Sequence, residues 1–327
     1  MPAPTVTEGE FIELWKSHGS PSKVASAIGT STRAVQERRR SIEIRRNISL
    51  PVTKGPRVEM ALKTYGHLQP YEYKRRHNLG ILDGQVLVFS DAHYWPGFRT
   101  VAHKALVKFI RDMKPRAVIC NGDAFDGAQI SRYPRIGWDS TPTVIDELKA
   151  VKERLGEVEE AAGRAKLVWP LGNHDARFEN RLAQNAPQFE GVTGFHLKDH
   201  FTEWEPCWAC WINDDTVVKH RMKGGIHATR NNTLNAGVNI VTGHLHQLKV
   251  TPLSDYNGNR YGVDTGTVAD VSGPQFINYT EAGPLDWRSG FAVLTFHKGR
   301  LLMPQLVQKW DDKHVEYAGS IFDVSDE

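Results

Sequence analysis

Between residues 86 and 246, five short apolar runs are each followed within four residues by aspartate, asparagine or histidine. The first three runs alternate with helix-like stretches, which is the pattern of an α/β fold. The polar clusters are Asp91-Ala92-His93, Gly122-Asp123-Ala124-Phe125-Asp126, Gly172-Asn173-His174-Asp175, His220 and Gly243-His244-Leu245-His246. Side chains that follow strand ends are delivered to one edge of a sheet, so we expect the five clusters to form one site.

The same alternation predicts the elements that carry these clusters. We expect strands over 86–89, 117–120 and 167–169, helices over 101–113 and 144–162, and a strand over 239–242. After about residue 206 the pattern turns to hairpins, one over 208–220 and one at Tyr256-Asn257-Gly258-Asn259, where Asn-Gly is a strong hairpin signal. The first hairpin would place Cys207 and Cys210 on opposite strand faces as structural residues, because no further soft ligands lie near them.

The first 46 residues have the start and stop signals of three short helices. Thr7 and Glu10 have capping-box spacing, Ser20-Pro21 begins a second helix that Gly29 ends, and Thr30 or Ser31 precedes a third. We expect Ala34 and Val35 to point inward from the third helix. The outward set would be Arg33, Gln36, Arg38, Arg39 and Arg40.

Residues 22–35 within this segment resemble the helix-turn-helix family of DNA-binding modules. In that family the last helix enters the major groove, which implies base or phosphate contacts for Arg33, Gln36, Arg39 and Arg40. Residues 1–80 hold 14 lysines and arginines against 7 acidic residues, so the segment is suited to a polyanion. The alternative is a helical cap that docks on the catalytic domain.

Residues 47–82 are rich in proline and glycine and have little periodicity. We interpret them as a linker or strap between a domain over 1–46 and a catalytic domain over 83–327. Within this segment, the basic run Lys74-Arg75-Arg76-His77 is either a solvated patch or an extension of a basic track.

The five clusters combine carboxylate, imidazole and amide groups, which are ligands for divalent metals such as manganese, iron or zinc. In order, they read D-x-H, G-D-x-x-D, G-N-H-D, a lone H and G-H-x-H, and they resemble the motifs of the calcineurin-like metallophosphoesterase family over roughly residues 84–270. The resemblance implies a sandwich of two mixed β-sheets flanked by helices, and two divalent metal ions. Manganese is the first expectation, with iron, zinc and nickel as the others.

Matching motif by motif, the resemblance implies a role for each polar residue. One metal would be held by Asp91, His93 and His246, the other by Asn173, His220 and His244, and Asp123 would bridge both. His174 would protonate the leaving oxygen, and Asp126 would orient His174. Relatives commonly place glycine after the lone histidine, whereas Arg221 follows His220 here, so His227 is the alternative ligand.

Two features favour a DNA-directed enzyme within this broad family. The chain has G-N-H-D where the serine/threonine protein phosphatases have G-N-H-E, and it lacks their arginine-glycine pair after Asp126. The motifs look more like those of DNA repair exonucleases and phosphodiesterases, as in phage or bacterial nuclease-like proteins. Two alternatives remain: a phosphomonoesterase or small-nucleotide phosphodiesterase, and a DNA-binding or assembly protein with a vestigial metal site.

The remaining expectations concern location and assembly. No apolar run approaches the roughly 20 residues needed to span a bilayer, and the N-terminus lacks a secretory signal pattern. Three cysteines also fit a reducing compartment. We therefore expect a cytoplasmic protein with no membrane partner, and the resemblance allows a homodimer.

Overall fold

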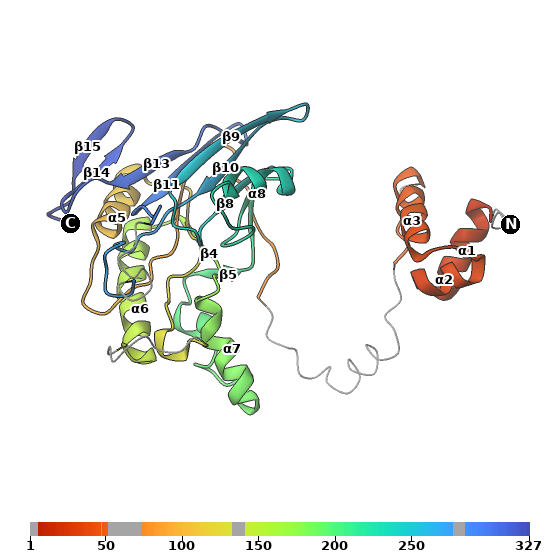
Figure 1. Ribbon diagram of the computed structural model, residues 1–327, viewed down its shortest axis with the longest axis horizontal. Coiled ribbons are helices and arrows are strands. Elements are labelled where there is room, and N and C mark those ends of the chain that lie inside the picture. The colour runs from red at the N-terminus through yellow and green to blue at the C-terminus, as the bar shows by residue number, and fades with distance from the viewer. Residues whose placement is uncertain (1–5, 47, 52–72, 133–140, 277–284) are drawn as a thin grey trace. The chain divides into compact units, whose positions relative to one another are not determined.

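Local sequence signals set the three helices at the N-terminus, as the computed structural model shows (Figure 1). The structure describes residues 6–46, 48–51, 73–132, 141–276 and 285–327. It divides into two compact units, Met1–Pro70 and Tyr71–Glu327, and each is described by itself. The first unit contains α1 (Glu8–His18), α2 (Pro21–Ile28) and α3 (Thr32–Arg46).

The predicted capping box and the stop at Gly29 are confirmed, and Pro21 begins α2, but the Ser20 side chain makes no capping hydrogen bond. Both bonds of the capping box form between Thr7 and Glu10, and Gly19 and Gly29 end α1 and α2 in the left-handed conformation, with φ of 55° and 67°. A small core holds the helices together, because their apolar faces meet in one cluster. Its buried members include Phe11, Trp15, Val24, Ile28, Val35 and Ile42.

The basic helix α3 departs from the prediction at three residues. Arg38, expected to face outward, is only partly exposed, and its guanidinium lies 5.0 Å from the centre of the Phe11 ring. Ala34 is exposed. Arg39, expected to face outward, is only partly exposed, and its guanidinium lies 5.1 Å from the centre of the Trp15 ring. Arginine often covers apolar surface with its stem, and a cation over an indole face is a favourable contact. Arg39 is therefore part of the packing of this unit, whereas Arg33, Gln36 and Arg40 are exposed.

The second unit is built on two sheets. One has the strand order β1-β6-β7-β8-β10-β9, and the other has the order β15-β14-β13-β11-β2-β3-β4-β5, with β12 paired to β11. The first sheet comprises β1 (His77–Leu79), β6 (Cys210–Ile212), β7 (Thr216–Val218), β8 (Asn239–Thr242), β9 (Lys249–Asp255) and β10 (Gly258–Asp264). The second comprises β2 (Gly84–Phe89), β3 (Ala117–Cys120), β4 (Lys166–Pro170), β5 (Glu205–Cys207), β11 (Gly290–His297), β12 (Arg300–Leu301), β13 (Gln305–Lys309), β14 (His314–Tyr317) and β15 (Ser320–Asp323).

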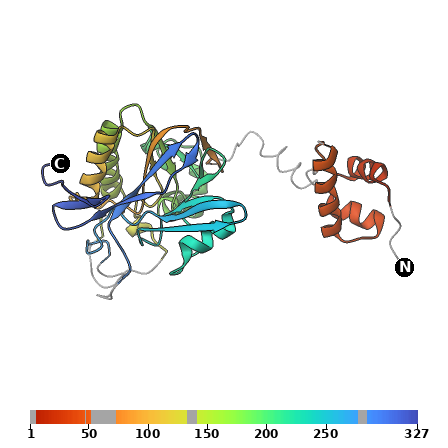
Figure 2. The same cartoon turned by 90° about the horizontal axis from the view of Figure 1, so that it is seen from above.

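The two sheets pack face to face, because apolar side chains of both form one buried cluster that includes Val88, Ile119, Ile212 and Val241. Helices α5 (Val101–Met113) and α6 (Val144–Ala162) pack side by side on the outer face of the larger sheet (Figures 1 and 2). Helix α8 (Ala228–Ala236) lies against the smaller sheet, where the Thr229 hydroxyl bonds that of Thr251 at 2.7 Å. The predicted sandwich of two mixed sheets flanked by helices is confirmed.

Most elements agree with the sequence prediction. The predicted helices 101–113 and 144–162 and the strands 117–120 and 239–242 are confirmed to the residue, and both predicted hairpins form. The described part of the chain contains no helix long and apolar enough to cross a membrane. Short helical elements complete the described unit: α7 (Asp175–Asn185) and the 3₁₀ turns Ala128–Ile130, Pro187–Phe189 and Leu197–His200.

Two local expectations were wrong or incomplete. Cys207 ends β5 of one sheet and Cys210 begins β6 of the other, so both thiols lie in the core between the sheets and not on opposite faces. Most of the predicted linker over 47–82 lies outside the described residues. Its end is ordered, because β1 pairs in parallel with β6, and a three-residue strand gives too little periodicity to predict.

Candidate metal centre

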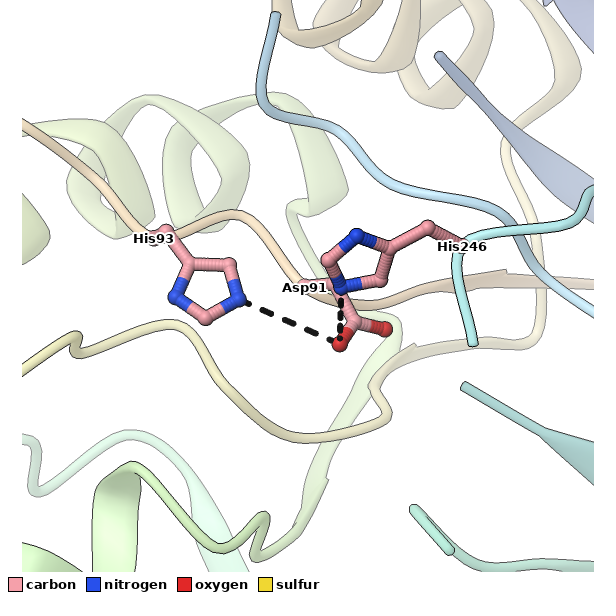
Figure 3. A group of neighbouring side chains, drawn as sticks. All are labelled: Asp91, His93 and His246. Atoms are coloured by element: carbon pink, nitrogen blue, oxygen red, sulfur yellow. Dashed lines mark hydrogen bonds and ion pairs between the residues drawn. The ribbon is translucent and has the colours of Figure 1, made fainter. Parts of the chain in front are cut away.

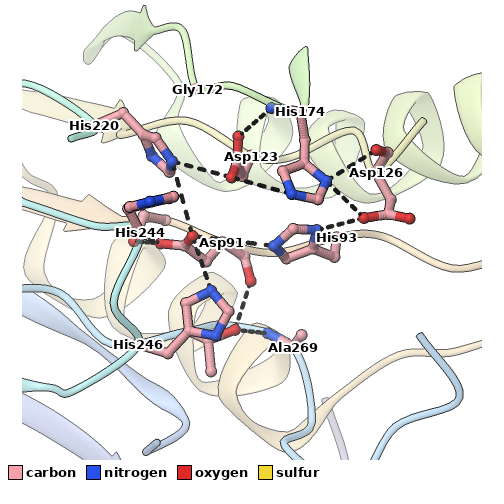
Figure 4. A network of polar contacts seen from close by, with 12 residues as sticks. Asp91, His93, Asp123, Asp126, Gly172, His174, His220, His244, His246 and Ala269 are labelled. Atoms are coloured by element: carbon pink, nitrogen blue, oxygen red, sulfur yellow. Dashed lines mark hydrogen bonds and ion pairs between the residues drawn. The ribbon is translucent and has the colours of Figure 1, made fainter. Parts of the chain in front are cut away.

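The carboxyl ends of five strands from both sheets meet at one site (Figure 4). Strands β2, β3 and β4 are parallel neighbours in the larger sheet, and β7 and β8 are parallel neighbours in the smaller sheet. Parallel strands bring their carboxyl ends to the same edge, so the residue just after each strand points into shared space. The structure therefore brings together eight of the nine predicted metal and proton-transfer residues: Asp91, His93, Asp123, Asp126, His174, His220, His244 and His246. The ninth, Asn173, directly precedes His174 in the chain and has a buried side-chain oxygen.

Five of these residues have a backbone conformation that side chains other than glycine rarely adopt. Their φ angles are positive: 53° at Asp91, 39° at His93, 55° at Asp123, 74° at His244 and 58° at His246. Each such residue costs on the order of 1–3 kcal/mol and persists only where the surrounding fold imposes it. The turns after the strands thus hold the donor groups in place against their local preference.

The first donor group consists of Asp91, His93 and His246, whose ligand atoms lie within 4.8 Å of one another (Figure 3). His246 Nε2 is 3.0 Å and His93 Nε2 is 4.0 Å from the same oxygen, Asp91 Oδ1. The other ring nitrogen of His93 lies 2.9 Å from Asp126 Oδ1. If Nδ1 donates that bond, Nε2 keeps its lone pair for a cation beside Asp91.

The second donor group consists of Asp123, His220 and His244. His220 Nδ1 lies 2.7 Å from the carbonyl oxygen of Asn121 and must donate to it, which leaves a lone pair on Nε2. That Nε2 is 3.0 Å from Asp123 Oδ2 and has no hydrogen-bond partner. His227, the alternative ligand, is exposed at the start of α8 and belongs to none of the donor groups found among the described residues.

Three buried atoms show that the site fits cations. Asn173 Oδ1, His220 Nε2 and His246 Nδ1 are buried without a hydrogen-bond partner. An unpaired buried polar group costs about 1–3 kcal/mol, and the buried carboxylates Asp91 and Asp123 need positive charge beside them. Oxygen and imidazole donors suit manganese, iron or zinc, so the donor set fits two divalent metal ions.

A further histidine, His174, faces the same space and forms a third possible donor group with His93 and Asp123. Its Nδ1 lies 2.8 Å from Asp126 Oδ1, and its Nε2 lies 3.1 Å from the Arg177 guanidinium, which can only donate, and 3.9 Å from Asp123 Oδ2. Burial disfavours the charged imidazole, but the carboxylates of Asp123 and Asp126 outweigh burial and raise the pKa of His174. A histidine that holds its proton beside a phosphoryl site is suited to protonate a leaving oxygen.

Asp126 contacts two histidines at once, because His93 and His174 share its Oδ1 (Figure 4). Burial alone would raise the pKa of Asp126, but the hydrogen bonds from His174 and His93 outweigh burial and hold that pKa well below its usual value. The ionised carboxylate therefore orients one candidate ligand and one candidate acid together.

Sequence reasoning assigned no role to two buried carboxylates that support the site. Asp175 accepts backbone bonds from Asp123 and Gly172, both at 2.8 Å, and a bond from the Trp169 indole at 3.0 Å. Glu147 of α6 accepts from the backbone of Gly127 at 2.6 Å and so fixes the turn after Asp126. Burial and the charge of Asp126 raise the pKa of Glu147 to about 7. The position of Asp175 in the G-N-H-D motif is a sequence signal for its supporting role, whereas no motif contains Glu147.

The segment Asp264-Thr265-Gly266-Thr267 follows β10 and lies beside the first donor group, where the Thr267 hydroxyl donates to the Asp91 carbonyl at 2.5 Å. The Asp264 carboxylate accepts from the backbone of Gln247 at 2.9 Å and Gly266 at 3.1 Å, and it belongs to none of the donor groups found among the described residues. Burial and the charge of Asp91 raise the pKa of Asp264 to about 7. Asp264 thus shapes the loop that carries His246.

Close packing explains the glycine of the G-N-H-D motif and gives a stability test. A Cβ on Gly172 would lie 2.0 Å from Asp123 Oδ1 and 2.5 Å from the Asp123 backbone nitrogen. We expect Gly172→Ala to lower the free energy of unfolding by about 1–3 kcal/mol or more, as overpacking does, and to lower metal affinity. Urea unfolding and metal titration would measure both.

Gly156→Ala is the control, because no atom lies within 4 Å of its new Cβ, and it should be neutral or stabilising by up to about 1 kcal/mol. Equal unfolding curves for the two variants would contradict this packing argument.

Comparison with known families agrees with this geometry. A family model described as calcineurin-like phosphoesterase matches residues 84–248, just over half of the chain. The chain belongs to the calcineurin-like phosphoesterase family. The family is one of metal-dependent phosphoesterases, and the matched segment contains every donor residue named above.

Two phage proteins are the curated relatives of this calcineurin-like chain. The Gene 54 protein of Mycobacterium phage L5 is 25% identical over 227 residues, and that of Mycobacterium phage D29 is 26% identical over 233 residues. Each alignment covers 62% of this chain and 86% of the relative.

Solved structures of similar proteins are more distant. Vacuolar Protein Sorting 29 from Cryptosporidium parvum is 14% identical with a TM-score of 0.41, over 74% of this chain and 100% of that chain. An archaeal phosphodiesterase is 13% identical with a TM-score of 0.32, over 69% of this chain and 99% of that chain.

Proposed function

We propose that this calcineurin-like phosphoesterase is a two-metal phosphodiesterase, and that its substrate is DNA. The observation that carries the proposal is the pair of donor groups, buried except for His244 and each holding an atom without a hydrogen-bond partner, beside His174, whose Nδ1 bonds the Asp126 carboxylate. A phosphoester placed between them has a proton donor on one side and paired cation sites on the other.

Two divalent cations, with manganese the first candidate, would supply charge neutralisation and an acidified water when bound. Asp91, His93 and His246 would hold one ion, and Asn173, His220 and His244 the other, with Asp123 between them. His174 would donate an Nε2 proton to the leaving oxygen once the Arg177 guanidinium has moved off that nitrogen, and Asp126 would hold the ring through Nδ1.

The N-terminal helices support the choice of DNA. Arg33, Gln36 and Arg40 lie exposed on α3, and the Arg33 side chain meets only the exposed Glu37 at 2.9 Å. An exposed i, i+4 pair contributes about 0.3–0.5 kcal/mol, so a phosphate can displace it. Because Arg39 packs on Trp15, it is not one of the proposed DNA contacts.

Variants of α3 in the full chain test the DNA proposal. We expect Arg33→Ala and Arg40→Ala each to weaken binding to duplex DNA and to reduce the slope of log affinity against log salt by about 1, because each removes one phosphate contact. Fluorescence anisotropy over a salt series would measure both quantities. Hydrolysis of bis-(p-nitrophenyl) phosphate should be unchanged in these variants.

Arg39→Ala separates packing from binding on the same helix. We expect it to lower the melting temperature of the N-terminal unit, because Arg39 covers Trp15, and to leave the salt slope near that of the unaltered chain. Should all three arginine variants bind DNA as the parent does while the small diester is still cut, DNA is not the substrate. The phosphomonoesterase or small-nucleotide phosphodiesterase alternative would then hold.

A further inference from the structure

A cavity of about 270 Å³ lies at the carboxyl edge of the larger sheet, beside the metal centre. Strand β5 is the neighbour of β4, and Trp208 follows β5 just as Leu171 follows β4. The end of β5 lies two strand spacings, or roughly 10 Å, from the end of β3, the strand that leads to Asp123. Leu171 and Asp175 line the cavity, and Asp175 also bonds the Asp123 backbone, so the two sites share a wall.

One wall of the cavity is an aromatic surface that solvent can reach. The Trp208 side chain is 45% exposed, and Tyr73 meets it edge to face with ring centres 6.2 Å apart. Tyr73 is itself held by its hydroxyl bond to Glu179, which also accepts from the Leu197 backbone at 3.0 Å. The indole is therefore in contact with a fixed tyrosine ring while part of Trp208 stays open to solvent.

Polar groups without partners lie next to this aromatic surface. In the run Lys74-Arg75-Arg76, Lys74 pairs with Glu205, and Arg76 lies 4.1 Å from the Trp211 ring centre, whereas Arg75 has no ion-pair partner among the described residues. The Lys74 carbonyl accepts from the Trp208 backbone at 2.9 Å, which ties Arg75 to the tryptophan. The Asn180 amide also lines the cavity and is exposed.

This combination fits a nucleobase better than other ligands. A cavity of this size is just below the range of about 300–1,000 Å³ for drug-sized ligands, so it suits one ring system and not a whole nucleotide. Aromatic side chains with a nearby arginine stack bases of any sequence, and an amide can bond a base edge. The carboxylates of Glu179 and Asp175 in the lining disfavour a free phosphate.

We propose that the cavity lined by Trp208, Tyr73, Arg75 and Asn180 is a base-binding subsite. It takes the base of a nucleotide near the scissile phosphate, stacked on Trp208, with Arg75 beside the adjoining sugar-phosphate. This proposal rests on the proposed phosphodiesterase function, and it adds the part of the substrate that the metal centre does not contact.

Binding without metal tests the subsite independently of hydrolysis. The full chain in EDTA is titrated into a fluorescein-labelled single strand of eight thymidines, and anisotropy is recorded. We expect Trp208→Ala to weaken binding about tenfold, Arg75→Gln to weaken it several-fold, and Trp208→Phe to restore most of the affinity because it keeps an aromatic face. Trp310→Ala and Arg300→Gln are matched controls, since Trp310 is 67% exposed and Arg300 is exposed away from the cavity.

Kinetic measurements with manganese then show whether the bound base belongs to a mononucleotide or to a nucleic-acid strand. For thymidine 5′-(p-nitrophenyl) phosphate and for the labelled strand, KM should rise in Trp208→Ala relative to Trp310→Ala, while KM for bis-(p-nitrophenyl) phosphate should not. A rise for the nucleoside ester as large as for the strand identifies a mononucleotide subsite, and a rise for the strand alone identifies a nucleic-acid subsite.

The outcomes separate this subsite from the function on which it rests. Equal affinity of Trp208→Ala and Trp310→Ala for the strand overturns the subsite, even where hydrolysis proceeds. Absence of hydrolysis in every form, together with Trp208-dependent binding, overturns the phosphodiesterase function and leaves a base-binding pocket.

Discussion

Replacing Asp123 by asparagine is expected to lower hydrolysis of bis-(p-nitrophenyl) phosphate by about 10³-fold or more. Asp123 lies against both His220 and His174 and would bridge the two cation sites, so the neutral amide weakens both. Metal ions contribute several kcal/mol to phosphoryl transfer, and about 4 kcal/mol corresponds to roughly 10³-fold in rate. Initial rates at saturating manganese measure this loss.

A second readout of the same variant does not depend on activity. Bound metal stabilises a fold by mass action, about 2.7 kcal/mol at 100 times the Kd. The parent chain should therefore melt at higher temperature with manganese than with EDTA, and Asp123→Asn should lose most of that difference. Asp264→Asn is the matched control, because Asp264 is equally buried but belongs to no donor group among the described residues. Full metal stabilisation and full activity in Asp123→Asn would refute the assignment.

Removing the imidazole of His174 should affect catalysis without affecting metal binding. General acid catalysis contributes typically about 10²–10⁴-fold, and this contribution matters most when the leaving oxygen is basic. We expect His174→Ala to lower kcat on DNA by that factor, to lower it much less on bis-(p-nitrophenyl) phosphate, and to keep the manganese-dependent rise in melting temperature. Rates on both substrates and thermal melting give these three quantities.

The double variant of His174 and Asp126 extends this test. Asp126 Oδ1 lies 2.8 Å from His174 Nδ1 and 2.9 Å from His93 Nδ1, so its replacement disturbs an acid and a ligand together. Asp126→Asn in the His174→Ala background should still lower activity and metal affinity, through His93 alone. If Asp126→Asn has no effect in that background, the contact with His93 carries no function.

Much of the larger unit could be predicted because its elements carry strong local signals. The helices 101–113 and 144–162 have long periodic patterns, and the strands 117–120 and 239–242 are uninterrupted apolar runs between polar clusters. The donor residues could be placed together for a related reason. They follow parallel strands, and parallel strands bring their carboxyl ends to one edge.

The remaining features depend on contacts between distant residues and have no local signal. Arg39 was expected to face solvent because a basic residue on a short helix usually does, yet it packs on Trp15, which lies 24 positions earlier. Cys207 and Cys210 were assigned to one hairpin, but the chain changes sheets between them. The cavity beside Trp208 combines residues from four segments, and no stretch of sequence contains its pattern.

The shared oxygen of Asp126 also limits how this protein can change over generations. A substitution that suits His93 must also suit His174, because one carboxylate serves both rings. The D-x-H and G-N-H-D motifs are therefore not free to drift separately, although 81 positions separate their histidines. Across descendants of this chain, a change at Asp126 should appear only with changes at both histidines, and lineages that lose one motif should soon lose the other.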